Sequence, residues 1–343
     1  MTTSSDQYKL RTWVQENLPE IGLGGVAIGN EFEYTSDDVA EQTLAAAWQA
    51  GVRYYDVSPW YGLGLAERRY GRFLHNQKRE DYIISSKVGK LLKASKNNNG
   101  AENFPYAYSP NNVEFDYSAE AVRRSIEDSL QRLGIDSLDI IFVHDLSPDN
   151  KFLKGNWLEH FAIAEKGAFP ELTKMREEGL IKAWGLGVNT PEPILKTIEV
   201  ADPDVFLLAS QYSLIEHEYA LNHVFPEVRK RNLSLVMGSN LNAGFLSGSD
   251  RYNYDPKKPI PPEFIAKKDK LQKIAAAHQV DLRTAALQFA IFPDVAAAVI
   301  PGARTPEQVT ENVASMKVEI PDAFWQELKQ QQIIAENAPV NKA

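Results

Sequence analysis

Residues 138–145 read LDIIFVHD, an almost unbroken apolar run that ends in two polar side chains. Strands covered on both faces have this near-continuous apolar pattern, whereas strands with one face in water alternate apolar and polar residues. The run VFLLASQ, at Val205–Gln211, has the same form. Both runs therefore predict buried strands of a parallel sheet, and the first places His144 and Asp145 at the carboxyl end of its strand.

Runs of this kind recur along the chain and are separated by amphipathic segments. The predicted strands are Gly25–Ile28, Arg53–Val57, Tyr82–Lys87, Leu138–His144, Ala183–Val188, Val205–Gln211, Leu233–Gly238 and Ala297–Ile300. Because strands and helices alternate through eight units, we expect an α/β fold, a closed (β/α)8 TIM barrel formed by residues 1–343 as a single domain. The alternative is an open, doubly wound sheet, which normally has a G-x-G-x-x-G turn, and the glycine-rich segment IGLGGVAIG lacks that spacing.

The segments between the runs carry helix signals. Ser36 and Ser118 are predicted N-caps, and Gly51 and Gly134 are predicted to end the helices that follow them. Further helices are predicted at Glu159–Glu178, Pro191–Val200, Glu218–Arg231, Pro262–His278, Asp281–Phe292, Pro306–Ser315 and Pro321–Ile334.

Two connections, Val88–Tyr117 and Ser247–Pro262, are longer than a compact barrel needs. Long loops after barrel strands lie at the C-terminal face and often form lids or walls that set specificity. We therefore expect at least part of each to border a binding site there.

The composition excludes several classes of protein. The chain has no cysteine, so disulfide frameworks and thiolate chemistry are excluded. Lys and Arg number 37 against 46 Asp and Glu, a net charge of −9, which opposes binding to nucleic acid or to an anionic membrane. The N-terminal sequence has no signal-peptide pattern, and no apolar stretch approaches the ~20 residues of a membrane helix. We expect a soluble, cytoplasmic protein without a metal site.

Ionisable side chains follow three successive predicted strands. Asp56 ends the second strand and Tyr61 lies just beyond it, Lys87 ends the third, and His144 ends the fourth. Each alone has an ordinary explanation, as a helix cap, a packed aromatic ring, a solvated lysine or a core histidine. Together they would meet at one mouth of a barrel, because the carboxyl ends of parallel strands share one rim.

Such a cluster can transfer protons. An ammonium lowers the pKa of a neighbouring phenol, a carboxylate keeps the ammonium charged, and an imidazole can hold a substrate oxygen against the phenol. The cluster suits a carbonyl/alcohol pair, and the hydride has to be exchanged with a bound cofactor.

Four motifs in this order give the chain a family resemblance. With GVRYYDVSPWYG (51–62), ISSKVG (84–89), RLGIDSLDIIFVHD (132–145) and IPGARTPEQVTEN (300–312), it resembles the aldo-keto reductases over essentially its whole length. The resemblance implies a nicotinamide enzyme in which Tyr61 is the general acid/base and Lys87 tunes it. It also implies that Asp56 pairs with Lys87 and that His144 orients the substrate oxygen.

The resemblance also implies a dinucleotide site. The matching positions are Asn189 and Gln211 for the carboxamide; Gly238, Ser239, Asn240, Leu241 and Leu246 for the pyrophosphate; and Pro301, Gly302, Ala303, Arg304, Gln308 and Asn312 for the adenosine end.

This chain departs from the family pattern in places. Val188 stands where many members have serine, and Gly302 and Gln308 stand where many NADPH-selective members have Lys and Arg. The missing cations favour NAD over NADP, although Arg304 can still reach a 2′-phosphate unless it pairs with Glu307 or Glu311.

The long insert after Lys87 makes the chain similar to the aldose 1-dehydrogenase branch of the family, of the D-threo-aldose (L-fucose/L-galactose) type. Members of that branch oxidise the hemiacetal hydroxyl of an aldose to a lactone. The resemblance implies a small-molecule sugar or another hemiacetal or carbonyl compound as substrate. We expect Trp60 and Asp145 in the substrate wall. The loop aromatics Phe104, Tyr106 and Tyr108 are candidates for the same wall, or they pack the loop over the rim.

Other interpretations stay open. A pyridoxal 4-dehydrogenase belongs to the same branch, and a general NADPH-dependent aldehyde or ketone reductase would use the same cluster. A Schiff-base aldolase would need Lys87 as a neutral amine, which Asp56 opposes. A cofactor-sensing subunit would bind nucleotide without turnover. The sequence does not distinguish a monomer from a homo-oligomer.

Overall fold

The computed structural model describes residues 12–96, 104–153, 156–252, 254 and 258–342. Its main sheet has eight parallel strands in the order β1-β2-β3-β6-β7-β8-β9-β10. These strands are β1 (Leu23–Gly24), β2 (Tyr54–Asp56), β3 (Ile83–Val88), β6 (Ile140–His144), β7 (Ala183–Val188), β8 (Val205–Ala209), β9 (Ser234–Gly238) and β10 (Ala296–Val299).

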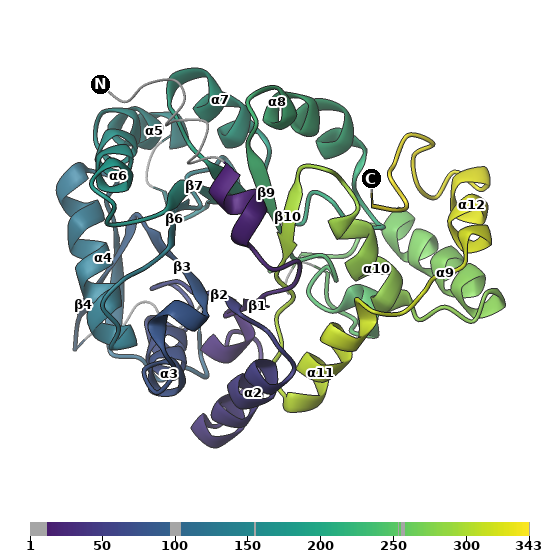
Figure 1. Cartoon of the computed structure of the whole chain (residues 1–343), viewed down its shortest axis with the longest axis horizontal. Coiled ribbons are helices and arrows are strands. Elements are labelled where there is room, and N and C mark those ends of the chain that lie inside the picture. Colours follow the sequence, from purple (N-terminus) through teal and green to yellow (C-terminus); the bar gives the residue numbers. More distant parts are fainter. Residues whose placement is uncertain (1–11, 97–103, 154–155, 253, 255–257, 343) are drawn as a thin grey trace.

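The two ends of this sheet join. Parallel bridges pair Ile21 with Val299 and Gly24 with Gly302, and the Gly22 amide donates to the Val299 carbonyl at 2.8 Å. The sheet is therefore a closed (β/α)8 barrel, ringed by helices in Figure 1. The predicted barrel is confirmed, and the open-sheet alternative is wrong.

The outer ring contains these α-helices: α2 (Asp37–Gln49), α3 (Leu65–Leu74), α4 (Ala119–Leu133), α5 (Trp157–Lys166), α6 (Ala168–Glu177), α7 (Glu192–Val200), α8 (Phe225–Lys230), α9 (Pro262–Ala277), α10 (Leu282–Ile291), α11 (Pro306–Ser315) and α12 (Asp322–Gln330). Shorter segments are the 3-10 turns η1 (Ala27–Gly29), η2 (Arg79–Asp81) and η4 (Phe245–Ser247) and the π-helical turn η3 (Ala220–Val224). In the part of the chain that is described, no helix is long and apolar enough to span a bilayer.

The predicted helix caps are confirmed. Ser36 Oγ accepts the Val39 amide at 3.3 Å, and Ser118 Oγ accepts the Ala121 amide at 3.2 Å. Gly51 and Gly134 follow these helices with φ angles of 92° and 65°, in the left-handed region that glycine adopts without a steric penalty.

The interior of the barrel is a closed apolar core. Inward side chains such as Tyr54, Phe142 and Val236 are fully buried, and Val14 and Leu18 pack with them. Val14 belongs to the N-terminal helix over 12–17, which Figure 1 shows in purple across one end of the barrel. The cavity described below lies at the opposite end, at the carboxyl ends of the strands.

The first strand differs from its prediction. Strand β1 pairs with β2 only at Leu23 and Gly24, and the chain then turns into η1 instead of continuing to Ile28. A Cβ atom on Gly25 would lie 2.8 Å from the Asp56 carbonyl oxygen, so only glycine allows the chain to turn this close to β2. The turn carries Val26 and Ala27 to the cavity wall instead of into the sheet.

Two helix predictions also need correction. The single helix predicted over Glu159–Glu178 is two helices, α5 and α6, because the chain bends at Gly167 (φ −119°, ψ −82°). Helix α3 (Leu65–Leu74) has no counterpart among the predicted helices. Helix α3 contains Gly71, where a Cβ atom would lie 2.3 Å from the Leu133 carbonyl oxygen. Glycine lowers the helix propensity of this segment, but it allows α3 to pack closely against α4.

The long connection after β3 contains an antiparallel hairpin, β4 (Lys90–Ala94) with β5 (Asn111–Phe115), that the sequence analysis missed. Both strands are short, and most of their side chains are only partly buried. An edge hairpin of this kind has no long apolar run, and this explains why the apolar pattern did not reveal it.

Candidate active site

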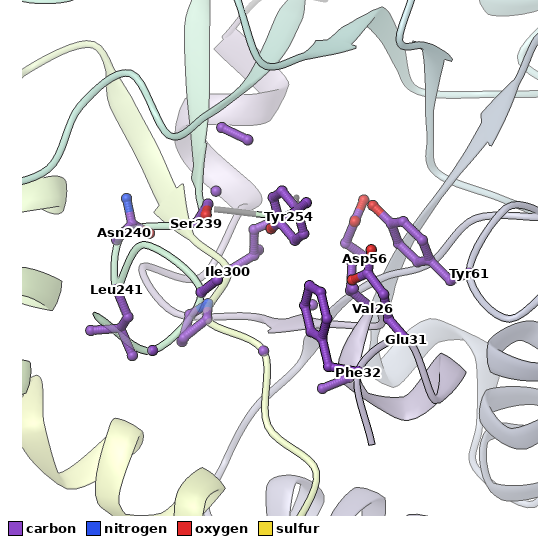
Figure 2. A pocket seen from close by; sticks show the side chains of 18 of the residues that line it. Val26, Glu31, Phe32, Asp56, Tyr61, Ser239, Asn240, Leu241, Tyr254 and Ile300 are labelled. Atoms are coloured by element: carbon purple, nitrogen blue, oxygen red, sulfur yellow. The ribbon is translucent and has the colours of Figure 1, made fainter. Parts of the chain in front are cut away.

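A cavity of about 670 Å³ opens at the carboxyl ends of the barrel strands. Its wall comes from the loops after β1, β2, β6, β7, β9 and β10, and Figure 2 shows side chains from several of these loops around it. Asp56, Tyr61, Lys87 and His144 all line this cavity. The structure therefore brings the four predicted reactive groups together, while their roles stay predictions.

Asp56 and Lys87 form a buried ion pair on neighbouring strands. The register aligns Asp56 with Ser85, and Lys87 Nζ lies 2.5 Å from Asp56 Oδ1. Ser85 Oγ donates to Asp56 Oδ2 at 2.6 Å, and Lys87 Nζ donates to the Val57 carbonyl at 2.9 Å. Burial lowers the pKa of Lys87, and the charge and hydrogen bond of Asp56 oppose that shift. Both polar ends thus have partners, which a buried ion pair requires.

Tyr61 lies over this pair. The ammonium of Lys87 is 4.7 Å from the centre of the Tyr61 ring, and the ring of His144 lies 5.8 Å away, edge to face. Figure 2 shows the phenol and Asp56 on the same side of the cavity. The phenol, ammonium, carboxylate and imidazole therefore meet at one lip of the barrel.

The pKa of Tyr61 differs in direction from the sequence expectation. Burial raises the pKa of Tyr61 well above its ordinary value, and the charge of Asp56 raises it further. The expectation that Lys87 lowers this pKa is not met, because desolvation of the ring and the charge of Asp56 outweigh any effect of the ammonium. Tyr61 is therefore a protonated phenol at neutral pH, a donor rather than a ready-made base.

His144 is a neutral imidazole. Burial lowers its pKa well below the ordinary range, and the positive charges of Lys90 and Lys87 lower it further. Its Nδ1 atom lies 3.0 Å from Ser58 Oγ, which also accepts the Trp60 amide at 3.1 Å. A neutral imidazole can donate one hydrogen bond to a substrate oxygen without adding charge.

A second buried ion pair lies beside the first. Lys90 Nζ contacts Asp145 Oδ2 and sits 4.4 Å from the centre of the Trp60 ring. Asp145 has a left-handed backbone (φ 46°), and its amide bonds to the Gly187 carbonyl at 2.9 Å. Sequence reasoning placed Asp145 in the wall, where it lies, but missed Lys90. Its position three residues after Lys87, in the same segment ISSKVGK, was the available signal.

Most positions predicted for the cofactor line the same cavity. These are Asn189, Gly238, Ser239, Asn240, Leu241, Pro301, Gly302, Arg304, Gln308 and Asn312. Gln211, Leu246 and Ala303 are not in the lining. Gln211 Nε2 donates to the Asn189 carbonyl at 2.8 Å, and Leu246 and Ala303 are buried in the core behind the wall.

The loop after β9 has a strained backbone and unsatisfied polar atoms. Ser239, Asn242 and Ala243 have φ angles of 57°, 48° and 56°. Both side-chain amide atoms of Asn240 are buried and lack hydrogen-bond partners among the described residues. Buried orphan amides on a cavity wall are costly unless a ligand satisfies them. Together with the neighbouring glycines, this donor and acceptor set fits a dinucleotide.

The end of the cavity that the adenosine positions line carries ion pairs. Glu33, from the loop after β1, lies 2.7 Å from Arg304 and 3.8 Å from Arg251. Glu307 and Glu311 were the carboxylates expected to pair with Arg304, and both expectations are wrong, because Arg304 pairs with Glu33. Glu311 instead contacts Arg283, which also lines the cavity.

Only one of the two long connections contributes described residues to the cavity wall. From the second, Ser247, Ser249, Arg251 and Tyr254 line the cavity, and Tyr254 stacks on Phe32 at 6.4 Å. No described residue between Val88 and Tyr117 lines it. The loop aromatics are therefore not part of this wall. Phe104 packs behind Trp60 with ring centres 5.3 Å apart, and Tyr106 and Tyr108 are exposed. Trp60 itself lines the cavity, as predicted.

Comparison with known proteins agrees with this fold and site. The family model described as "Aldo/keto reductase family" matches residues 20–333. The chain is 33% identical to a D-threo-aldose 1-dehydrogenase from a Pseudomonas species, covering 92% of this chain and 95% of the relative. It is 33% identical to a pyridoxal 4-dehydrogenase from Microbacterium luteolum, covering 92% and 94%. The fold is similar to that of an aldo-keto reductase from Bacillus halodurans in its holo form, with a TM-score of 0.69, 20% identity and coverage of 94% and 95%.

The chain therefore belongs to the aldo/keto reductase family. It is an NAD(P)-dependent oxidoreductase, an enzyme class that acts on small carbonyl compounds and their alcohols.

Proposed function

We propose that the protein oxidises the hemiacetal hydroxyl of an aldose, of the L-fucose, L-galactose or D-threo-aldose type, to a lactone. NAD is the proposed preferred cofactor over NADP. The observation that carries the proposal is the convergence of Tyr61, Lys87, Asp56 and His144 at the bottom of a cavity large enough for a dinucleotide and a small substrate.

The proposed chemistry moves one proton and one hydride. His144 donates a hydrogen bond to the oxygen on the anomeric carbon and holds it against the phenolic oxygen of Tyr61. Because the phenol of Tyr61 is protonated at neutral pH, it first releases its proton to solvent through the open cavity, and the phenolate then takes the hydroxyl proton as the C–H bond breaks and the carbonyl of the lactone forms. A nicotinamide held at Asn189 would supply the hydride acceptor. Lys87, held by Asp56, supplies the positive charge that stabilises the phenolate during this transfer.

Asn189, Asn240 and Asn312 would hold the dinucleotide with the glycines of the β9 and β10 loops. The preference for NAD is supported by Gly302 and Gln308, which offer no cation, and by Glu33, which engages Arg304. A carboxylate at this end would repel a 2′-phosphate.

Two further observations bear on the substrate. The similarity to an aldose dehydrogenase favours a sugar, and the equal similarity to a pyridoxal dehydrogenase makes the cyclic hemiacetal of pyridoxal a second candidate. Both substrates present a hemiacetal C–H beside a hydroxyl, so the same groups would serve. A general NADPH-dependent aldehyde or ketone reductase is less well supported, because Gly302 and Gln308 stand where many NADPH-selective members have cations and Glu33 engages Arg304.

The test is a matrix of substrates and cofactors. Initial rates are measured with L-fucose, L-galactose, D-arabinose and pyridoxal, each with NAD⁺ and NADP⁺, and with methylglyoxal and NADPH in the reverse direction. The proposal expects the highest kcat/KM with an aldose and NAD⁺. Faster reduction of methylglyoxal than oxidation of any hemiacetal would overturn it.

A further inference from the structure

One carboxyl group in the cavity has no part in the chemistry above. Glu31, in the loop after β1, lines the cavity on the same side as Tyr61 and Asp56, as Figure 2 shows. Its Oε2 atom is buried and has no hydrogen-bond partner among the described residues. A buried, unpaired carboxyl oxygen is destabilising, so its retention in a binding cavity points to a ligand.

The loop that carries Glu31 is held rigidly. Asn30, with a left-handed backbone (φ 58°), accepts the Thr35 amide at 3.1 Å and Arg69 Nη1 at 2.8 Å. Arg69 also donates to the Ile28 and Thr35 carbonyls at 2.7 Å and 2.6 Å. The Glu31 carboxyl is therefore presented from a preorganised backbone rather than from a loose loop.

Charged and titratable groups face Glu31 from four other segments. They are Tyr61 after β2, Lys90 in β4, Asp145 after β6, and Arg251 and Tyr254 in the loop after β9. Burial raises the pKa of Glu31 to about 8, Arg251 opposes that shift, and Asp145 adds to it. At neutral pH the group is a carboxylic acid, which can donate one hydrogen bond and accept another.

We propose that Glu31 is a specificity-determining residue that binds a second hydroxyl group of the substrate, one that does not react. A neutral acid complements a hydroxyl, which is also both donor and acceptor, and adds no net charge beside Asp145. The inference rests on the proposed function and deepens it, because it selects polyhydroxylated substrates over simple alcohols and aldehydes.

The test uses Glu31→Leu and Glu31→Gln, with Glu199→Gln on the exposed face of α7 as a matched control. The best aldose is compared with its single-deoxy analogues. In Glu31→Leu we expect KM for the aldose to rise about ten-fold with kcat changed less than two-fold, the loss of one hydrogen bond to a buried group. The preference over the deoxy analogue that lacks the bound hydroxyl should disappear.

Glu31→Gln keeps a neutral donor and acceptor, so it should retain most of that preference at pH 7. It should also remove any rise in KM above pH 8, where ionised Glu31 can no longer donate. If Glu31→Leu discriminates among the deoxy analogues as well as the wild type does, the inference is wrong.

A reductive comparison separates this result from failure of the proposed function. Reduction of glyceraldehyde, which has hydroxyls beside its carbonyl, is compared with reduction of methylglyoxal, which has none. If the wild type oxidises no aldose, the proposed function fails, and Glu31→Leu is judged on this pair alone. A fall in its glyceraldehyde-to-methylglyoxal ratio of kcat/KM supports a hydroxyl-binding role, and an unchanged ratio excludes it.

Discussion

Ser58 Oγ lies 3.0 Å from Nδ1 of His144, and the same oxygen accepts the amide of Trp60 at 3.1 Å. With that amide bond made, the hydroxyl proton of Ser58 is free to be donated to Nδ1. We infer that Ser58 donates to Nδ1, so that the imidazole carries its own proton on Nε2, the nitrogen that lies 3.5 Å from Asp145 Oδ2. In that arrangement Nε2 is the nitrogen of His144 that can donate to a substrate oxygen.

Replacing Ser58 with alanine should remove the hydrogen bond that fixes the proton of His144 on Nε2. We expect Ser58→Ala to lower kcat by about ten-fold, the scale of one lost hydrogen bond to a buried group, while the affinity for the cofactor stays the same. Steady-state kinetics and cofactor titration measure the two effects. Ser315→Ala, which removes another buried and hydrogen-bonded serine, controls for general loss of packing. An equal fall in both variants would contradict the role of Ser58.

Removing the phenolic hydroxyl should nearly abolish turnover. Tyr61→Phe keeps the ring that packs on Lys87 and His144, so we expect an unchanged melting temperature. We also expect a fall in kcat of about a hundred- to ten-thousand-fold, the usual contribution of a general acid or base. Tyr106→Phe changes an exposed tyrosine outside the cavity and should leave kcat unchanged. Wild-type rates in Tyr61→Phe on every active compound would show that another group moves the proton.

The buried ion pair should contribute measurably to stability. Asp56→Asn leaves the ammonium of Lys87 without its counter-charge, and breaking a buried pair in this way costs about 3 kcal/mol or more. Urea denaturation measures the change. The surface pair Arg229–Asp294 provides the comparison, because Asp294→Asn should cost less than about 1 kcal/mol. Similar losses of stability in both variants would mean that another group compensates the charge of Lys87.

The charge of Glu33 should affect the choice of cofactor. Glu33→Gln removes the carboxylate from Arg304 and Arg251, so both cations become available to a 2′-phosphate. We expect the NADP⁺-to-NAD⁺ ratio of kcat/KM to rise by about ten-fold, equivalent to ~1.4 kcal/mol. Glu307→Gln, at a carboxylate that does not line the cavity, should leave the ratio unchanged. A ratio that falls in Glu33→Gln would exclude this explanation.

Acid should destabilise the docking of the C-terminal segment. His217 Nε2 accepts the Ala335 amide at 3.0 Å, and burial lowers the pKa of His217 to about 4. The unfolded chain takes up a proton near pH 6.5 and the folded chain does not, so stability is complete above pH 6.5 and falls as the pH drops towards 4. His144, whose pKa is also lowered, contributes with the same sign.

The loss should approach ~1.4 kcal/mol per pH unit for each histidine within this window. Denaturation at pH 7 and pH 5 measures it. His217→Gln should make the curve flatter, whereas His75→Gln, at an exposed histidine, should not. A wild-type stability that is constant from pH 7 to pH 5 would contradict this assignment.

The apolar runs predicted the barrel because each buried strand is covered on both faces, and this pattern is local in the sequence. They also predicted the positions of Asp56, Lys87 and His144, since strand ends share one rim. Lys90, Glu31 and Glu33 lie outside such runs, on a hairpin and a loop whose paths depend on tertiary contacts. The direction of the Tyr61 pKa was also missed, because desolvation depends on how completely the surrounding loops cover the ring.

The helix that packs Val14 beneath the strands closes one end of the barrel with hydrocarbon. Among the residues that the structure describes, the cavity proposed for cofactor and substrate opens at the other end. Under the proposed function, a dinucleotide held by residues such as Asn240 and Asn312 would share this cavity with the smaller molecule. We therefore expect an ordered kinetic scheme in which the nucleotide binds first and leaves last, because both molecules would use the same cavity.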